Sequence, residues 1–341
     1  MLRVGLANIK LSMKSKKPDN LLSASDIVFN HGENRVLSKV SLSLNNGEVL
    51  GIAGESGSGK TTLLKILAAK LAPDEGHIMY EGEDIYKAHN QLLRGHEDIK
   101  IVDQDFDLMP FITVDENILR NALSLSEGSR KRLLGHLKNN LKLRPVGNQK
   151  AVNTSGGQKQ RVALATAVAS KPQVLILDEP FANLDYALKL NVIALLKEQW
   201  KPKAMIVVAH EPADLLGMST RILILQKGKV IQTGLVKEVY KNPKNLYTAK
   251  LLGPVNELSK DLRKALDLPE GKNWVRPHEL ELGKSGVKAE VKSIHFCGSY
   301  NEVILKTEEY DQLLTVHYDA LMKPPGKGDM IFVCPRKINI S

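Results

Sequence analysis

A glycine-rich run at residues 54–61 is the part of this sequence whose residue types most clearly carry chemistry. It reads Gly-Glu-Ser-Gly-Ser-Gly-Lys-Thr and fits the phosphate-binding pattern G-x-x-x-x-G-K-[ST]. Such a loop turns consecutive backbone N–H groups inward, and the helix that follows adds the positive end of its dipole. The run therefore predicts a triphosphate site, in which Lys60 reaches the β- and γ-phosphates and Thr61 ligates Mg²⁺.

The residues on either side of the loop supply the context that this pattern requires. Residues 48–53 are apolar enough to form a buried strand, and apolar residues recur at helical spacing from Leu63 to Leu71. A strand, a loop and a helix in this order are what phosphate binding needs. The predicted nucleotide contacts of this segment are Gly54, Glu55, Ser56, Gly57, Ser58, Gly59, Lys60, Thr61 and Thr62.

Length and composition limit the class of protein. The chain has 341 residues, 43% hydrophobic and 25% charged, which is typical of a globular protein and enough for two domains. The net charge of +10 is compatible with binding to nucleic acid, with binding to an anionic membrane surface or with no specific partner. The charge alone does not decide between these, because lysine is spread along the whole sequence.

The cysteines and the apolar runs bear on where the protein works. Cys297 and Cys334 fit no metal-ligand spacing and are too few for a disulfide scaffold, so we expect a reduced, intracellular protein. No apolar run approaches the ~18 residues of a membrane-spanning helix. If the protein works at a membrane, other subunits are expected to cross it.

The N-terminal part of the chain predicts β-structure around the loop. Residues 1–24 read as a polar extension, and strand patterns follow from Ile27 to Leu44. Asn45-Asn46-Gly47 is a hairpin turn signal that leads into the strand before the loop. A mostly helical insert is expected within residues 85–155.

A second group of polar residues follows the predicted insert. A glycine pair leads into a helix at about residue 159, and residues 174–177 form a continuous apolar run that ends at Asp178 and Glu179. Another apolar run, at residues 205–209, ends at His210. Such runs are typical of parallel strands that are covered on both faces, and ligands of such sheets bind at the carboxyl ends of the strands.

These motifs together resemble the ATP-binding-cassette (ABC) ATPases, over residues 24–250. The order of the motifs is that of the family: the phosphate loop, a glutamine after a strand, a glycine-containing signature, an acidic pair, an aspartate in the next loop and a histidine. The residues that carry the resemblance beyond the loop are Gln104, Ser155, Gly156, Gly157, Gln158, Asp178, Glu179, Asp185 and His210.

The resemblance implies a role for each polar residue in the hydrolysis of ATP. Asp178 would hold Mg²⁺ through a water, and Glu179 would be the general base that orients the attacking water. His210 would contact the γ-phosphate. Gln104 would sense the γ-phosphate or the metal and pass that signal into the helical insert.

The signature implies a second copy of the cassette. Ser155 and the N–H groups of Gly156 and Gly157 precede a helix and offer a second phosphate-binding surface. In the family this surface serves the nucleotide of a partner cassette, so a homodimer or a related partner is implied. Two departures from the family pattern are Thr154, where leucine is common, and His31, where an aromatic residue commonly stacks on adenine, although Phe29 is nearby.

The C-terminal part predicts a second, smaller domain. A hairpin at residues 221–232 is expected to close the cassette sheet, Leu258, Leu262 and Leu266 give an amphipathic segment, and short strands follow from residue 274. These strands suggest a small β-barrel. Residues 274–282 and 326–329 resemble the regulatory (TOBE-like) domain of importer-type cassettes. The expected domains are an extension at 1–24, a cassette at 25–245, a linker at 246–272 and a β domain at 273–341.

The expected fold is thus an α/β P-loop cassette, with a mostly parallel sheet and an antiparallel β subdomain, followed by a small β-barrel-like domain. The resemblance implies an ATPase subunit of an importer, on the cytoplasmic face of the inner membrane, with permease subunits and a solute-binding protein as partners. Nucleic acid is not expected, because the aromatic residues of the β domain form no stacking run. A soluble mechanical ATPase and a non-hydrolysing regulatory subunit stay open as alternatives, as does the solute.

Overall fold

The computed structural model describes residues 20–88, 95–103, 105–182, 184–199 and 202–336. The chain divides into two compact units, which we call the cassette unit (Met1–Thr233) and the C-terminal unit (Gly234–Ser341). The predicted domain bounds stay predictions, but helices α8 (Val236–Lys241) and α9 (Leu246–Leu251) fall on the C-terminal side of this division. Among the described residues, no helix combines the length and the apolar character that crossing a membrane demands.

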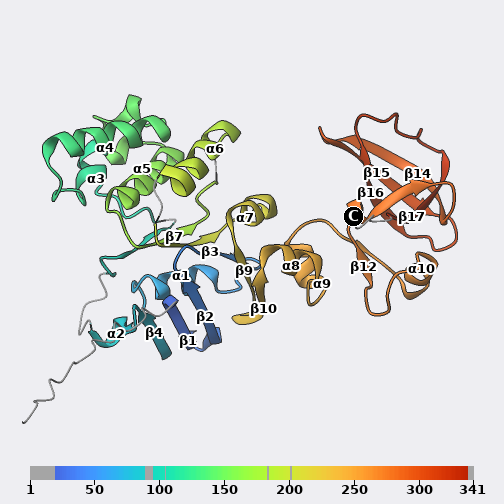
Figure 1. Ribbon diagram of the computed structural model, residues 1–341, viewed down its shortest axis with the longest axis horizontal. Coiled ribbons are helices and arrows are strands. Elements are labelled where there is room, and N and C mark those ends of the chain that lie inside the picture. The colour runs from blue at the N-terminus through green and yellow to red at the C-terminus, as the bar shows by residue number, and fades with distance from the viewer. Residues whose placement is uncertain (1–19, 89–94, 104, 183, 200–201, 337–341) are drawn as a thin grey trace, which may run out of the picture. The chain divides into compact units, whose positions relative to one another are not determined.

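The cassette unit is built on two sheets (Figure 1). The first is a four-stranded sheet in the order β2-β1-β4-β5, with β1 antiparallel to both of its neighbours. The second is a six-stranded sheet in the order β10-β9-β3-β8-β7-β6, in which β3, β6, β7, β8 and β9 run parallel. The strand bounds are β1 Asn20–His31, β2 Asn34–Asn45, β3 Val49–Ala53, β4 Glu75–Tyr80, β5 Glu83–Asp84, β6 Ile99–Val102, β7 Val174–Asp178, β8 Ala204–Val208, β9 Arg221–Gln226 and β10 Lys229–Leu235.

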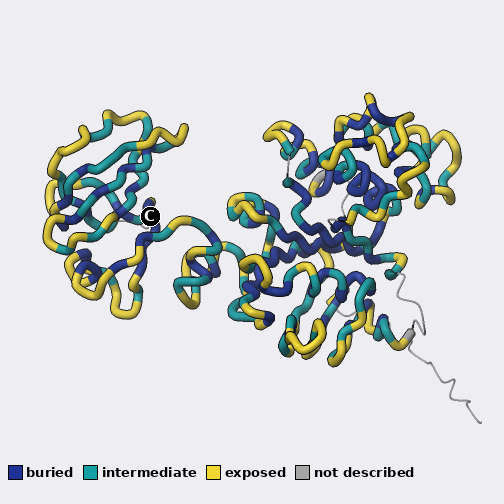
Figure 2. Tube along the Cα trace, turned by 180° about the vertical axis from the view of Figure 1, so that it is seen from behind, coloured by how far each residue is buried: buried dark blue, intermediate teal, exposed yellow. Residues whose placement is uncertain are grey.

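Helices cover both faces of the six-stranded sheet. Strand β7 alternates between two cores, because Ile176 packs with α1 and the four-stranded sheet, whereas Leu175 and Leu177 pack with α4, α5 and α6. This two-sided burial explains its continuous apolar sequence. Figure 2 shows the buried strands of this sheet as dark segments. The helices are α1 Lys60–Leu67, α2 Ile85–Ala88, α3 Val114–Leu119, α4 Glu127–Asn140, α5 Gly156–Ala169, α6 Tyr186–Ala194 and α7 Pro212–Met218, with shorter helical turns at Arg144–Val146, Ala151–Asn153 and Leu195–Gln199.

Two sequence-based expectations need correction in this unit. Strand β1 begins at Asn20, inside the segment 1–24 predicted as a polar extension, because Leu21 and Leu22 are buried in the core. The turn at Asn45 to Gly47 does not close a hairpin. It joins β2 to β3, which lie in different sheets, because β3 finds its partners in β8 and β9.

The C-terminal unit contains a five-stranded sheet in the order β13-β17-β14-β15-β16 with antiparallel pairing throughout. Strands β13 and β16, at its two edges, come close to each other, which gives the sheet a barrel-like curvature and confirms the predicted barrel-like fold. The predicted amphipathic leucines Leu258, Leu262 and Leu266 are buried against it. The bounds are α8 Val236–Lys241, α9 Leu246–Leu251, β11 Asn256–Glu257, α10 Lys260–Ala265, β12 Trp274–Val275, a turn at Pro277–Glu279, β13 Leu280–Gly283, β14 Val287–Phe296, β15 Tyr300–Thr307, β16 Leu313–Asp319 and β17 Met330–Pro335.

Candidate functional site

The phosphate loop connects the end of β3 to the start of α1, as the sequence predicts. Gly59 has a φ of +101°, which side-chain-bearing residues rarely adopt. A Cβ atom on Gly54 would lie 2.4 Å from the carbonyl oxygen of Leu225 in β9. The backbone path of the loop therefore requires glycine at both positions.

Lys60 bends back across this loop. Its Nζ donates hydrogen bonds to the carbonyl oxygens of Gly54 at 2.7 Å and Glu55 at 2.8 Å. Burial lowers the pKa of the Lys60 ammonium, while the nearby carboxylates of Asp178 and Glu179 oppose that shift. The side chain thus spans the space that the loop encloses, where its charge is available to an anion.

Asp178 ends strand β7 beside the start of α1. The hydroxyl of Thr61 donates a hydrogen bond to Asp178 Oδ2 at 2.9 Å. The Asp178 side chain is buried, and burial raises the pKa of its carboxyl although the Thr61 bond opposes the shift. Thr61 and Asp178 therefore place oxygen atoms, the ligand type that Mg²⁺ prefers, together at the carboxyl end of the sheet.

Glu179 is held in an unusual backbone conformation. Its φ is +57°, in the left-handed region that residues other than glycine seldom occupy. Its N–H donates to the Val208 carbonyl at 2.9 Å, and its own carbonyl accepts a bond from Gln160 Nε2 at 2.8 Å. Such strain persists where neighbouring contacts fix it, and it is common at functional sites.

The side chain of Glu179 meets that of His210. Glu179 Oε1 lies 2.7 Å from His210 Nε2, and His210 follows the end of β8. The imidazole is largely exposed, whereas the carboxylate is mostly covered. The strand ends of β7 and β8 thus bring two residues together that are far apart in sequence.

A cavity of about 230 Å³ opens beside these carboxylates. It reaches the first residue of α5, Gly156, so the acidic pair and the signature border the same space. The cavity is lined by Val102, Asp103, Phe106, Gly156, Gln160, Asp178, Glu179 and Ala182.

The signature itself forms a helix start. Ser155 caps α5, because its Oγ accepts a bond from Gln158 N at 3.3 Å and its N–H donates to Gln158 Oε1 at 2.8 Å. Apart from its two chain neighbours and the backbone of its own helix, no described atom lies within 4 Å of the place where Gly156 would carry a Cβ atom. Ser155 thus caps the N–H of Gln158, and the N–H groups of Gly156 and Gly157 at the start of α5 have no acceptor within the helix.

The other predicted site residues are dispersed over the cassette unit. Asp185 caps α6 by accepting a bond from Leu188 N at 2.8 Å, and this bond and Lys142 lower the pKa of its carboxyl. His31 is exposed at the end of β1. Thr62 lies in α1. Gln104 lies outside the described residues.

The remaining residues of the phosphate loop hold its shape. The N–H of Ser58 donates to the Glu55 carbonyl at 3.1 Å, and the Ser58 carbonyl accepts from Gly228 N at 3.0 Å. Ser58 Oγ is buried and has no hydrogen-bond partner among the described residues. Ser56 and Gly57 lie between these anchored positions and are exposed.

Sequence reasoning missed two residues that border the cavity. Gln160 is buried in α5 and fixes the backbone of Glu179. Asp103 is buried at the end of β6, where its Oδ2 lies 3.4 Å from Lys70 Nζ and its Oδ1 has no hydrogen-bond partner among the described residues. The position of Asp103 at a strand end was the available signal, whereas nothing in the pattern marked Gln160.

The departure at Thr154 has a simple structural basis. The Thr154 side chain is buried, and its hydroxyl donates to the Ala151 carbonyl at 2.7 Å. This bond satisfies the hydroxyl locally, so threonine fits a position where the resemblance leads us to expect leucine.

Comparisons with known proteins agree with this geometry. The profile of the family described as ABC transporter matches residues 37–182. The glucose import ATP-binding protein GlcV of Saccharolobus solfataricus is 32% identical, over 92% of this chain and 95% of GlcV. The spermidine/putrescine import ATP-binding protein PotA of Pasteurella multocida is 37% identical over 69% of this chain, and the match spans 64% of PotA, slightly less than two thirds of its length.

A solved structure has the same fold over the cassette unit. The dimeric ATP-binding cassette MJ0796, in a post-hydrolysis state bound to ADP and phosphate, aligns with a TM-score of 0.56 and 27% identity. The alignment covers 63% of this chain and 98% of MJ0796. It confirms the predicted cassette fold. The family match and the full-length similarity to GlcV confirm the predicted resemblance, so this chain belongs to the ABC transporter family.

Proposed function

We propose that this chain is the ATP-hydrolysing subunit of an ABC importer. The observation that carries the proposal is the convergence of Lys60, Thr61, Asp178 and Glu179 at the carboxyl ends of parallel strands, behind a glycine loop shaped for phosphates. The relatives described above are named as import ATP-binding proteins, which supports import over a mechanical or a purely regulatory role.

ATP is the proposed nucleotide and Mg²⁺ the proposed metal. Thr61 and Asp178 would hold the ion, since Mg²⁺ commonly takes one or two protein oxygens and completes its shell with phosphate oxygens and water. When bound, the ion neutralises charge on the β- and γ-phosphates. Lys60 would exchange its bonds to the Gly54 and Glu55 carbonyls for bonds to phosphate oxygens.

Glu179 is the proposed general base. Its backbone is fixed from two sides, so its carboxylate has a defined direction, and its bond to His210 limits the rotation of the side chain. A carboxylate held in this way can accept a proton from a water that attacks the γ-phosphate. His210 would hold this carboxylate in place, and the exposed edge of the His210 imidazole would face the γ-phosphate.

The signature is proposed to act on the nucleotide of a second cassette. The start of α5 around Ser155 offers N–H groups to open space, which suits an anion brought by a partner chain. The dimeric state of MJ0796 supports this pairing. Asp185 is proposed to join this composite site, and His31 is proposed to stack on the adenine.

A surface next to the cavity is proposed to receive the permease. A smaller hollow, of about 180 Å³, is lined mostly by apolar residues, and Phe111 next to Pro110 in the sequence is 75% exposed. The lining residues are Phe106, Leu108, Pro110, Ala151 and Val152, together with the charged Asp105 and Lys159. Exposed apolar groups around a hollow are typical of a protein-binding site. We place the partner at the cytoplasmic face of the membrane, with a solute-binding protein on the other side and no role for nucleic acid.

The catalytic part of the proposal is tested with Glu179→Gln. The variant is expected to bind ATP and to accumulate as an ATP-bound dimer in light scattering, while turnover falls roughly 100-fold or more. Glu211→Gln, an exposed neighbour of His210, serves as the matched control and should hydrolyse ATP normally. If Glu179→Gln kept its turnover within about twofold, the assignment of the general base would be wrong.

The import part of the proposal is tested at the permease surface. Phe111→Ser should abolish co-purification of membrane subunits from detergent extracts, while the ATPase activity of the isolated chain persists. Leu190→Ser removes another exposed apolar side chain of the cassette unit and is the control. Equal recovery of membrane subunits with both variants would contradict the proposed docking surface.

A further inference from the structure

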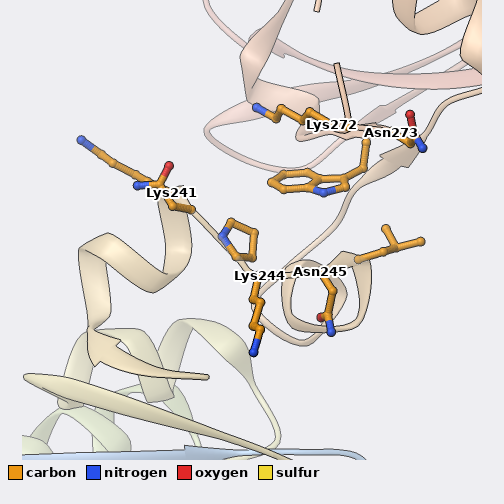
Figure 3. A pocket seen from close by; sticks show the side chains of 10 residues that line it. Lys241, Lys244, Asn245, Lys272 and Asn273 are labelled. Atoms are coloured by element: carbon orange, nitrogen blue, oxygen red, sulfur yellow. The ribbon is translucent and has the colours of Figure 1, made fainter. Parts of the chain in front are cut away.

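The C-terminal unit contains a cavity of about 630 Å³ that nothing in the proposed function uses. It lies between residues 241–246, which join α8 to α9, and residues 271–274, which lead into β12 (Figure 3). We call it the lysine cavity. Its volume falls in the range of roughly 300–1,000 Å³ that is usual for small-molecule sites.

Positive charge surrounds this cavity. Its lining includes Lys241, Lys244 and Lys272, and no acidic residue is among the described residues that line it. In Figure 3 Lys241 and Lys272 extend toward the same side and Lys244 points away from them, so the three ammonium groups do not meet at one point. A ligand with several separated negative charges fits this spread better than a compact monovalent anion.

Trp274 forms a wall of the cavity and brings further charge. Its indole is only 8% exposed, and Lys272 Nζ lies 4.9 Å from the ring centroid. The buried guanidinium of Arg276 lies 5.8 Å from the same centroid and adds a fixed positive charge behind the wall. Glu279, 3.3 Å from Lys272 Nζ, offsets part of this charge without lining the cavity.

Amide groups supply hydrogen-bond donors. Asn245 Oδ1 accepts a bond from Thr248 N at 2.9 Å, which leaves the side-chain NH₂ as the group available to a ligand. Asn273 lines the opposite segment, and its main-chain carbonyl accepts a bond from Leu258 N at 3.0 Å, which anchors that segment. Lysine and amide donors together are suited to phosphate oxygens.

We propose that the lysine cavity binds a small soluble compound that carries more than one phosphate group. A recessed space with a tryptophan wall suits a free compound better than the phosphate headgroups of a flat membrane, which are the other source of the same chemistry. The ligand would bridge residues 241–246 and 271–274, which are separate in sequence, and would therefore stabilise the C-terminal unit.

Fluorescence of the full chain tests the proposal. The sequence has two tryptophans, so Trp200→Phe leaves Trp274 as the only reporter. In a chain that also carries Lys60→Ala, which weakens phosphate binding at the phosphate loop, fructose 1,6-bisphosphate and pyrophosphate should change its emission saturably, and fructose should not. Calorimetric titration of the unmodified chain with the same probes provides a second readout, which does not depend on the folding of Trp200→Phe.

Charge variants distinguish specific binding at the lysine cavity from non-specific electrostatic attraction of the ligand. Lys241→Ala with Lys244→Ala should weaken bisphosphate binding roughly tenfold or more, because each lysine is a charged donor to phosphate. Lys284→Ala with Lys327→Ala removes the same charge from exposed positions of the same unit and should change the affinity less than about twofold.

Three results would overturn the proposal. The first is the absence of saturable binding in both the fluorescence and the calorimetric titration. The second is an equal loss of affinity in the two lysine pairs, which would mean non-specific attraction. The third is a response to phosphatidylglycerol vesicles without a response to the soluble probes, which would assign the surface to lipid.

Discussion

The cassette unit and the C-terminal unit place their polar groups in different ways. In the cassette unit the acidic residues follow buried parallel strands, and backbone conformation fixes them, as the left-handed φ of Glu179 illustrates. In the C-terminal unit the charged groups of the lysine cavity lie in connecting segments beside an antiparallel sheet. This difference shows that chemistry fixed by the backbone leaves a sequence pattern, whereas a cavity bordered by lysines from separate connecting segments does not.

Among the predictions that test this comparison of the two units, Asp178→Asn has the largest expected effect. Turnover should fall roughly 100-fold or more, because a carboxylate at the proposed metal site becomes neutral. The nucleotide-free protein should at the same time become more stable, by about 1 kcal/mol, because a buried charge is removed. ATPase assays and thermal unfolding of the same preparation check both parts.

The stability gain of Asp178→Asn has a defined pH dependence. Burial raises the folded-state pKa of Asp178, so the folded protein binds this proton more tightly than the unfolded chain. The contribution of Asp178 to stability therefore falls as the pH rises from the ordinary carboxyl pKa through the raised one. The gain should be absent below this window and complete above it, and a gain that shrinks with rising pH would contradict the account.

A smaller effect is expected for Gln160→Ala. Gln160 is a positioning residue that fixes the Glu179 carbonyl, so its loss should lower kcat about tenfold and leave KM nearly unchanged. Lys159→Ala, the adjacent position of α5, is the control. A rise in KM with unchanged kcat would instead indicate that Gln160 acts on nucleotide binding.

Leu305→Ala should have the smallest effect on nucleotide chemistry. Leu305 is fully buried in the core of the C-terminal unit, so its truncation should cost about 2–5 kcal/mol of unfolding free energy in that unit. ATP affinity should change less than about twofold, because no site residue of the cassette changes. Calorimetry and nucleotide titration check this prediction. Ile176→Ala, in β7, is the comparison variant, because it truncates a buried side chain of the cassette unit instead. A large loss of ATP affinity in Leu305→Ala would remove the distinction between the units.

Several elements could be predicted because one local pattern determines them. The continuous apolar run of β7 is typical of a strand buried on both faces, and the glycines of the phosphate loop allow backbone conformations that other residues rarely adopt. The cavity residues Gln160 and Asp103 could not be assigned in this way, because their roles depend on contacts across the fold. The turn after β2 was misjudged for the same reason: distant strands decide where β3 pairs.

The central claim is that one ATP lies between Lys60 of one chain and Ser155 of its partner. Mixing a Lys60→Ala chain with a Ser155→Arg chain tests it most directly, because only the mixed dimer contains one site in which both groups are intact. The account predicts that each variant alone is inactive and that an equal mixture recovers about a quarter of the wild-type ATPase rate, since half of the randomly paired dimers are mixed. A mixture as inactive as its components, with dimers present, would contradict it.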